Sequence, residues 1–232
     1  RFVSEGWSVK KMHRLIMLSR TYRLATARSA AAEAKDPNNE LLASYPRRRL
    51  DAESIRDTLL TLGGSLDLTP GGAHPFPPQT DWKFTQHNPF KATYETNKRS
   101  VYLMTQRIQR HPYLAIFDGA DPSVSTPGRT ASTTPLQSLY FLNDPLVHEQ
   151  AQRFADRLIA ERPDEGARLQ LASELAFCRQ AGPDELERAR HFLGAARAKL
   201  SESDAAPDKL ESQTWQAFVR VLFRLNEFVY LD

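Results

Sequence analysis

Proline and glycine interrupt the chain between residues 63 and 98 so often that no long helix or strand can form there. Proline removes a backbone donor and clashes with the preceding helical turn, and glycine readily takes the left-handed conformation that ends helices. The interruptions include Gly63-Gly64, Gly71-Gly72, Pro75, Pro77-Pro78 and Pro89. Residues 65–98 are therefore predicted to be an irregular loop or insertion. Aromatic residues within it favour a loop that is packed down, and they are Phe76, Trp82, Phe84, Phe90 and Tyr94.

Helical periodicity governs the chain on either side of this loop. Ser8 is a suitable N-cap, and the apolar residues after it recur at spacings of three and four, which predicts an amphipathic helix. Similar patterns predict a helix over 47–62 and, after the Thr134-Pro135 cap, helices near 135–142, 146–161, 164–179, 184–200 and 208–226. The predicted fold class is therefore mainly α, an orthogonal or bundle-like helical domain with little or no β.

Length and composition predict one folded domain over residues 1–232. A chain of 232 residues with 41% apolar and 25% charged residues can bury a substantial core, which excludes wholesale disorder. Arg1 is not an initiator and Phe2-Val3 resembles the end of an element, so we expect the domain to be truncated at its N-terminus. No apolar run approaches the roughly 18 residues that a membrane span needs, so no membrane insertion is predicted.

Charge is distributed unevenly along the sequence. Lysine and arginine outnumber acids in residues 1–60, whereas acids outnumber them in 136–232. Because the basic residues interleave with acids and apolar residues, they favour a solvated face with internal ion pairs, and no nucleic-acid partner is predicted.

Motifs for cofactors and metals are missing from the sequence. Cys178 is the single cysteine, which excludes an intrachain disulfide, Cys-x-x-Cys motifs and haem attachment through Cys-x-x-Cys-His. Its apolar helical neighbours favour an inert core thiol. The histidines lack metal-ligand spacing, so we predict no metal site and no cofactor in this chain.

The densest group of charges lies at residues 47–57. On a helix, Arg49 and Glu53 would lie four residues apart, as would Glu53 and Asp57, while Arg56 follows Glu53 by three. One interpretation is a site for an acidic ligand, lined by arginines such as Arg48, with Glu53 or Asp57 as acid or base. The other is a ladder of ion pairs, which we favour because pairing lowers the pKa of a carboxyl group.

Further polar residues offer weaker candidates. Asp118 resembles a turn residue more than a ligand or general base. Glu227, near the end of the last predicted helix, is expected to pair with a buried arginine. Six further residues are predicted either to line an anion or sugar pocket or to form hydrogen bonds to the backbone of the irregular segments. They are Arg99, Tyr102, Arg107, Arg129, Gln137 and Asn143.

Several blocks of sequence, taken in order, resemble one known family. They are GWSVKKMHRLIMLSRTYR, DPNNELL, RRRLDAESIRDTLL, RSVY, FDGADP, RTASTTPLQSLYFLND and the stretch from Trp215 to the terminal NEFVYLD. The chain is similar in these blocks to planctomycete surface domain one, a domain of unknown function found toward the C-terminus of large exported planctomycete proteins. The resemblance implies an extracytoplasmic location, at the cell surface or in the periplasm, beside other domains of the same polypeptide. Relatives often carry a planctomycete-type cytochrome c domain, which would hold any haem.

Two functions remain open at this point. We favour a non-catalytic interaction module that binds a polysaccharide, a cell-envelope partner or a neighbouring domain through the loop around Trp82 and the arginine clusters. The alternative is an enzyme or enzyme subdomain for acidic or sulfated glycans, with Arg48 and Arg56 orienting the anion and Glu53 or Asp118 moving a proton. An unpaired carboxylate in one pocket with these arginines would favour the enzyme over the binding module.

Overall fold

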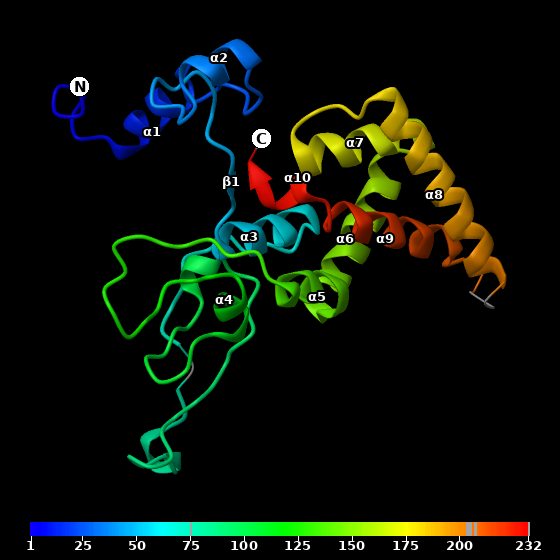
Figure 1. Cartoon of the computed structure of the whole chain (residues 1–232). Coiled ribbons are helices and arrows are strands. Elements are labelled where there is room, and N and C mark those ends of the chain that lie inside the picture. Colours follow the sequence, from blue (N-terminus) through cyan, green and yellow to red (C-terminus); the bar gives the residue numbers. More distant parts are fainter. Residues whose placement is uncertain (75, 203–205, 207, 232) are drawn as a thin grey trace. The chain divides into compact units, whose positions relative to one another are not determined.

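The computed structural model describes residues 1–74, 76–202, 206 and 208–231. About half of the described chain is helical, and the only sheet among the described residues has two short strands, which confirms the mainly α class (Figure 1). The elements are α1 (Val9–Met17), α2 (Ala30–Lys35), β1 (Arg48–Arg49), α3 (Ala52–Leu62), the 3-10 helices η1 (Gln79–Asp81) and η2 (Ser100–Tyr102), α4 (Pro112–Ile116), α5 (Pro135–Asn143), α6 (Pro145–Glu161), α7 (Glu165–Phe177), α8 (Pro183–Glu202), α9 (Leu210–Leu222), α10 (Asn226–Val229) and β2 (Tyr230–Leu231).

The chain divides into two compact units, and the smaller comprises residues 1–49 with strand β2. Strands β1 and β2 pair antiparallel, with Arg48 opposite Leu231 and Arg49 opposite Tyr230. As predicted, Ser8 caps α1, and its hydroxyl accepts from the Lys11 amide at 3.3 Å. No apolar residue among 1–49 is buried, so this unit has little core of its own. The single-domain organisation stays a prediction.

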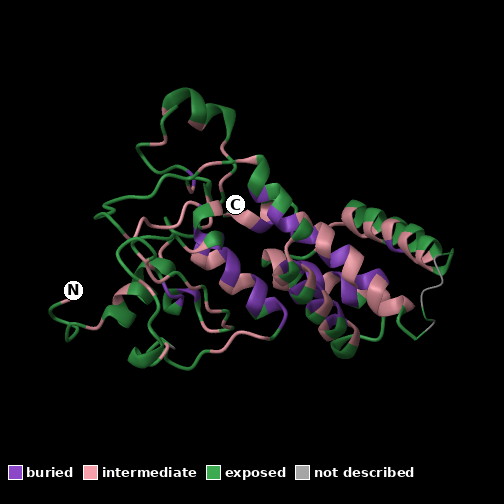
Figure 2. Cartoon of the chain, turned by 90° about the horizontal axis from the view of Figure 1, so that it is seen from below, coloured by how far each residue is buried: buried purple, intermediate pink, exposed green. Residues whose placement is uncertain are grey.

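The larger unit, residues 50–229, contains the apolar core. Helix α9 packs against α6 and α8, and α3 packs against α6. The fully buried residues of this core include Phe154 and Leu158 on α6 and Trp215 and Val219 on α9. Figure 2 shows the buried residues concentrated along helices, with loops largely exposed. Burial of large apolar side chains is the main source of stability in such a core.

Local capping explains where the helices after the long loop begin. The Thr134 hydroxyl accepts from the Gln137 amide, and the Gln137 side chain accepts from the Thr134 amide, which forms a capping box. Asp144 then ends α5 and caps α6 by accepting from the Leu146 amide at 2.9 Å. These signals are local in sequence, and the predicted helices near 135–142 and 146–161 therefore have nearly correct boundaries.

The predicted helix over 47–62 begins too early. Helix α3 starts at Ala52, and Asp51 caps it by accepting from the Ser54 amide at 2.8 Å. Arg48 and Arg49 lie in strand β1 instead, because their backbone pairs with β2. The end of the helix is as predicted, and Gly64 follows it with a φ of +67°.

Two further predictions need correction. The single helix predicted over 208–226 ends at Leu222 as α9, and a turn separates it from the short α10. Cys178 is exposed and does not lie in the core. It ends α7 with a φ of +57°, and this left-handed residue terminates the helix before its side chain can join the apolar face.

Candidate functional site

Helix α3 brings the first candidate carboxylate, Glu53, against an arginine from a distant loop. Arg129 donates to Glu53 Oε2 at 2.5 Å and to Oε1 at 2.9 Å, and the two residues are 76 positions apart. Hydrogen bonding to Glu53 raises the pKa of Arg129. Arg49 lies in strand β1, so it does not share a face of α3 with Glu53 as the helical spacing had predicted. Both carboxylate oxygens of Glu53 therefore accept from Arg129.

The next turn of α3 organises the segment around residues 96–100. Arg56 is buried and donates to the Lys98 carbonyl at 3.1 Å, the Ser100 hydroxyl at 3.3 Å and the Thr96 carbonyl. Asp57 accepts from the Ser100 amide at 2.7 Å. These contacts satisfy backbone groups of an irregular segment, whereas the structural alternative weighed for Arg56 and Asp57 was a ladder of ion pairs.

The third carboxylate, Asp118, lies at a turn, as predicted. Its backbone has a φ of +59°, and its carboxylate accepts from the Ser132 amide at 2.9 Å and hydroxyl at 2.8 Å. Gln137 is buried nearby and donates to the Ile116 carbonyl at 2.9 Å and to Asp118 at 3.4 Å. Asp118 therefore ties the loop before α5 to the end of α4.

The irregular loop over 65–98 is closed at its base. The Asp67 amide donates to the Asn97 carbonyl at 2.8 Å, and Lys98 Nζ lies 2.8 Å from Asp67 Oδ2. Hydrogen bonds from Lys98 and Thr69 hold the pKa of Asp67 well below its ordinary value. Within 65–98 the described backbone contains η1 and an isolated bridge between Asp67 and Lys98. A loop with joined ends can hold a defined arrangement of side chains at its tip.

Aromatic rings gather within this loop. Trp82 and Phe84 have ring centroids 5.0 Å apart, and Phe90 contacts both Phe84 at 5.5 Å and Phe76 at 5.1 Å. We call these four residues the aromatic cluster. The Trp82 indole donates to the Pro77 carbonyl at 2.9 Å, which fixes the ring, yet 46% of the residue is exposed. The cluster packs on itself and still presents apolar surface.

The remaining candidates make separate contacts. Arg48 stacks its guanidinium 5.9 Å from the Tyr45 ring, and Arg99 Nε lies 3.6 Å from Asp57. Tyr102 packs over Gly71, where an added Cβ would lie 2.6 Å from Tyr102 Cδ1. Arg107 and Asn143 are exposed, and Arg49 lies in β1.

His111 is a titratable residue that the sequence did not single out. Both ring nitrogens are buried and lack a hydrogen-bond partner among the described residues. Burial lowers the pKa of His111, Glu95 raises it, and Arg56 lowers it further. The sequence offered no signal for this site, because it depends on segments that meet only in the fold.

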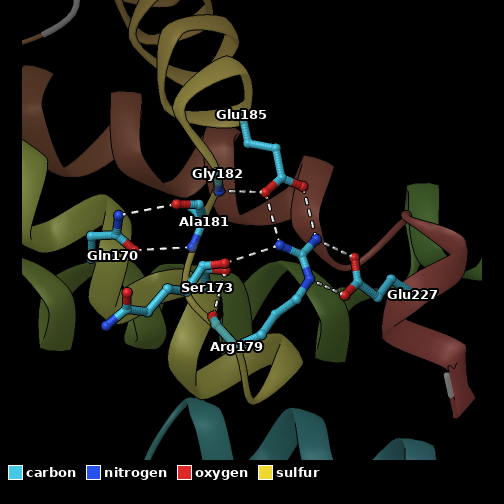
Figure 3. A network of polar contacts seen from close by, with 8 residues as sticks. Gln170, Ser173, Arg179, Ala181, Gly182, Glu185 and Glu227 are labelled. Carbon is cyan, nitrogen blue, oxygen red and sulfur yellow. Dashed lines mark hydrogen bonds and ion pairs between the residues drawn. The ribbon is translucent and has the colours of Figure 1, made fainter. Parts of the chain in front are cut away.

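A network around Arg179 joins three helices of the larger unit (Figure 3). The guanidinium contacts Glu185 through two hydrogen bonds of 2.8 Å and Glu227 through bonds of 2.5 and 2.7 Å. The predicted arginine partner of Glu227 is therefore confirmed, but the pair is partly exposed, not buried. Hydrogen bonds from Arg179 and the Gly182 amide lower the pKa of Glu185 to about 2. Paired in this way, these carboxylates stabilise the structure and are poor candidates for acid chemistry.

No group of three or more His, Cys, Asp or Glu side chains in the described ranges is placed to hold a metal ion. Likewise, none of the described helices combines the length and apolar character needed to cross a membrane.

Comparison with known proteins gives one match. The model of PSD1, described as a protein of unknown function (DUF1553), matches residues 1–193. No curated protein and no solved structure matches the chain significantly. The match covers most of the sequence and agrees with the resemblance to planctomycete surface domain one. The chain therefore belongs to the PSD1 family, whose function is unknown.

Proposed function

We propose that this chain is a non-catalytic binding module of a larger exported protein, and that it contacts a polysaccharide or a partner domain. The observation that carries the proposal is the state of the three candidate carboxylates. Glu53 is paired with Arg129, Asp57 with Ser100 and Arg99, and Asp118 with Ser132. A general acid or base must reach a substrate proton, and these groups already serve the fold.

The aromatic cluster is the contact surface that we propose. Aromatic side chains combine large apolar area with low conformational freedom, and they are enriched at binding interfaces. Its ring arrangement is fixed by mutual contacts and by the bond from Trp82 to Pro77. Exposed Lys83 and Lys91 lie next to cluster residues in the sequence, whereas Asp81 is the one exposed acid directly beside them, so an acidic or sulfated polymer fits this surface better than a cationic one.

The extracytoplasmic location is part of the same proposal. It is supported by the resemblance to a family of exported proteins, in which neighbouring domains of the polypeptide are the nearest partners. A cytochrome c domain, where one accompanies the chain, would carry its own haem.

A thermal-shift and titration screen tests this function. The chain is mixed with neutral, uronic-acid and sulfated glycans, and Kd is measured for any glycan that raises the melting temperature. Trp82→Ala probes the aromatic cluster. Trp7→Ala is the matched control, because Trp7 is an exposed tryptophan outside the loop.

We expect saturable binding that Trp82→Ala weakens about tenfold or more and that Trp7→Ala leaves unchanged, since aromatic anchors often contribute over about 1.4 kcal/mol. Equal effects of the two substitutions would remove the aromatic cluster as the contact surface. A complete lack of response to every glycan would exclude the polysaccharide and leave a partner domain as the ligand.

A further inference from the structure

Helix α1 has an apolar face that stays exposed within the smaller unit. Val9, Leu15 and Ile16 lie on one side of the helix by their spacing, and none of the residues of α1 is buried. Trp7, directly before the helix, is 66% exposed and packs its ring 5.3 Å from Phe2. In Figure 2 the segment next to the N-terminus is coloured largely as exposed. An apolar face of this kind requires a partner that removes it from water.

The opposite face of α1 specifies the charge of that partner. Lys10, Lys11 and Arg14 lie there, about half a turn from the apolar side. Between Glu5 and Glu33 the chain has six lysine or arginine residues and no aspartate or glutamate. A partner that offers both an apolar region and anionic groups therefore fits this element best.

A second copy of this chain does not meet the requirement. A two-fold contact through the apolar faces of α1 would leave both basic faces without an anionic partner, because the segment between Glu5 and Glu33 contains no acid. A lipid surface does meet it, because anionic headgroups lie directly above acyl chains. Amphipathic helices with basic polar faces and aromatic or aliphatic apolar faces bind in that interface.

We propose that Trp7 and α1 form an interfacial element that binds the surface of an anionic lipid membrane. The apolar face enters the boundary between headgroups and acyl chains, and the lysines and Arg14 contact the headgroup phosphates. Tryptophan is suited to this depth because its ring is apolar and its N–H is polar. The element lies on the membrane without crossing it, and it is independent of the aromatic cluster.

Vesicle flotation of the full chain tests the proposal. One set of vesicles contains phosphatidylcholine with about 30% phosphatidylglycerol, and the other contains phosphatidylcholine alone. Ile16→Glu removes apolar surface from α1, and Lys11→Glu reverses one charge. Leu136→Glu on α5 and Lys199→Glu on α8 are matched controls, because both residues are exposed in the larger unit. Circular dichroism verifies that every variant retains its helices.

We expect binding to anionic vesicles that falls about tenfold or more with Ile16→Glu and with Lys11→Glu, weakens with added salt, and is unchanged in both controls. Binding to neutral vesicles should be much weaker. The proposal is overturned if anionic vesicles leave the chain unbound at low salt, which is the result expected if an acidic protein covers α1. It is also overturned if Ile16→Glu binds as well as the wild type, since attraction would then be purely electrostatic.

Discussion

Replacing Arg179 by glutamine removes the cation that joins α7, α8 and α10, and we expect the free energy of unfolding to fall by about 1–2 kcal/mol. Arg179 engages Glu185 and Glu227 through four hydrogen bonds of 2.5 to 2.8 Å. The shift of the Glu185 pKa from 4.5 to about 2 would alone correspond to at most about 3 kcal/mol. The Glu185 side chain is 39% exposed, so water screens the pair and the smaller figure applies.

Urea denaturation followed by circular dichroism at two pH values measures this effect. The pKa of Glu185 is lowered in the folded state, so its contribution is present above pH 4.5 and is lost as the pH falls toward 2. The difference between wild type and Arg179→Gln should therefore be largest near neutral pH and smaller near pH 3. Arg224→Gln, at an exposed arginine, is the control. A loss no greater than that of Arg224→Gln, or one independent of pH, would refute the stabilising role of the network.

Three further predictions concern the apolar core, the buried His111 and the exposed Cys178. Phe154→Ala should lower the free energy of unfolding by about 3–5 kcal/mol in urea melts, because Phe154 has no exposed surface and its loss leaves a cavity; a loss under about 1 kcal/mol would contradict this packing. Burial lowers the pKa of His111, so the unfolded chain binds a proton more readily and stability should fall as the pH drops below about 6.5. Melts of His111→Phe should show a smaller decline between neutral and acidic pH, and an identical decline would exclude His111 as the cause. Cys178 should react with a thiol reagent in the native protein without prior unfolding, whereas protection until the melting transition would place it in the core.

The sequence predicts the helices between residues 135 and 202 well because their start signals are local. Thr134 and Gln137 form a capping box around Pro135 at the first helical position, and Asp144 separates two helices. The pattern of apolar residues then identifies the faces that meet in the core, including Trp215 and Val219. Such features depend on near neighbours in the chain and so are visible without the fold.

The features that could not be predicted from the sequence are contacts between residues that are far apart along the chain. Arg48 and Arg49 form a strand only because residues 230–231 pair with them. Glu53 has its partner at Arg129, 76 residues away, although the sequence offered Arg49 at a helical spacing. Sequence reasoning favoured ion pairs for Glu53 and Asp57, but it could not identify Arg129 and Arg99 as the arginines that contact them.

The central claim is that the candidate carboxylates maintain the fold while the chain binds without catalysis. The direct test is prolonged incubation with each glycan that binds, followed by chromatography of the glycan, for the wild type and for Glu53→Gln, Asp57→Asn and Asp118→Asn. We predict that every glycan is recovered intact from the wild type, and that any variant effect is a change in melting temperature. Cleavage by the wild type that one of these substitutions abolishes, in a variant that still folds and binds, would contradict the account and assign the chain a catalytic role.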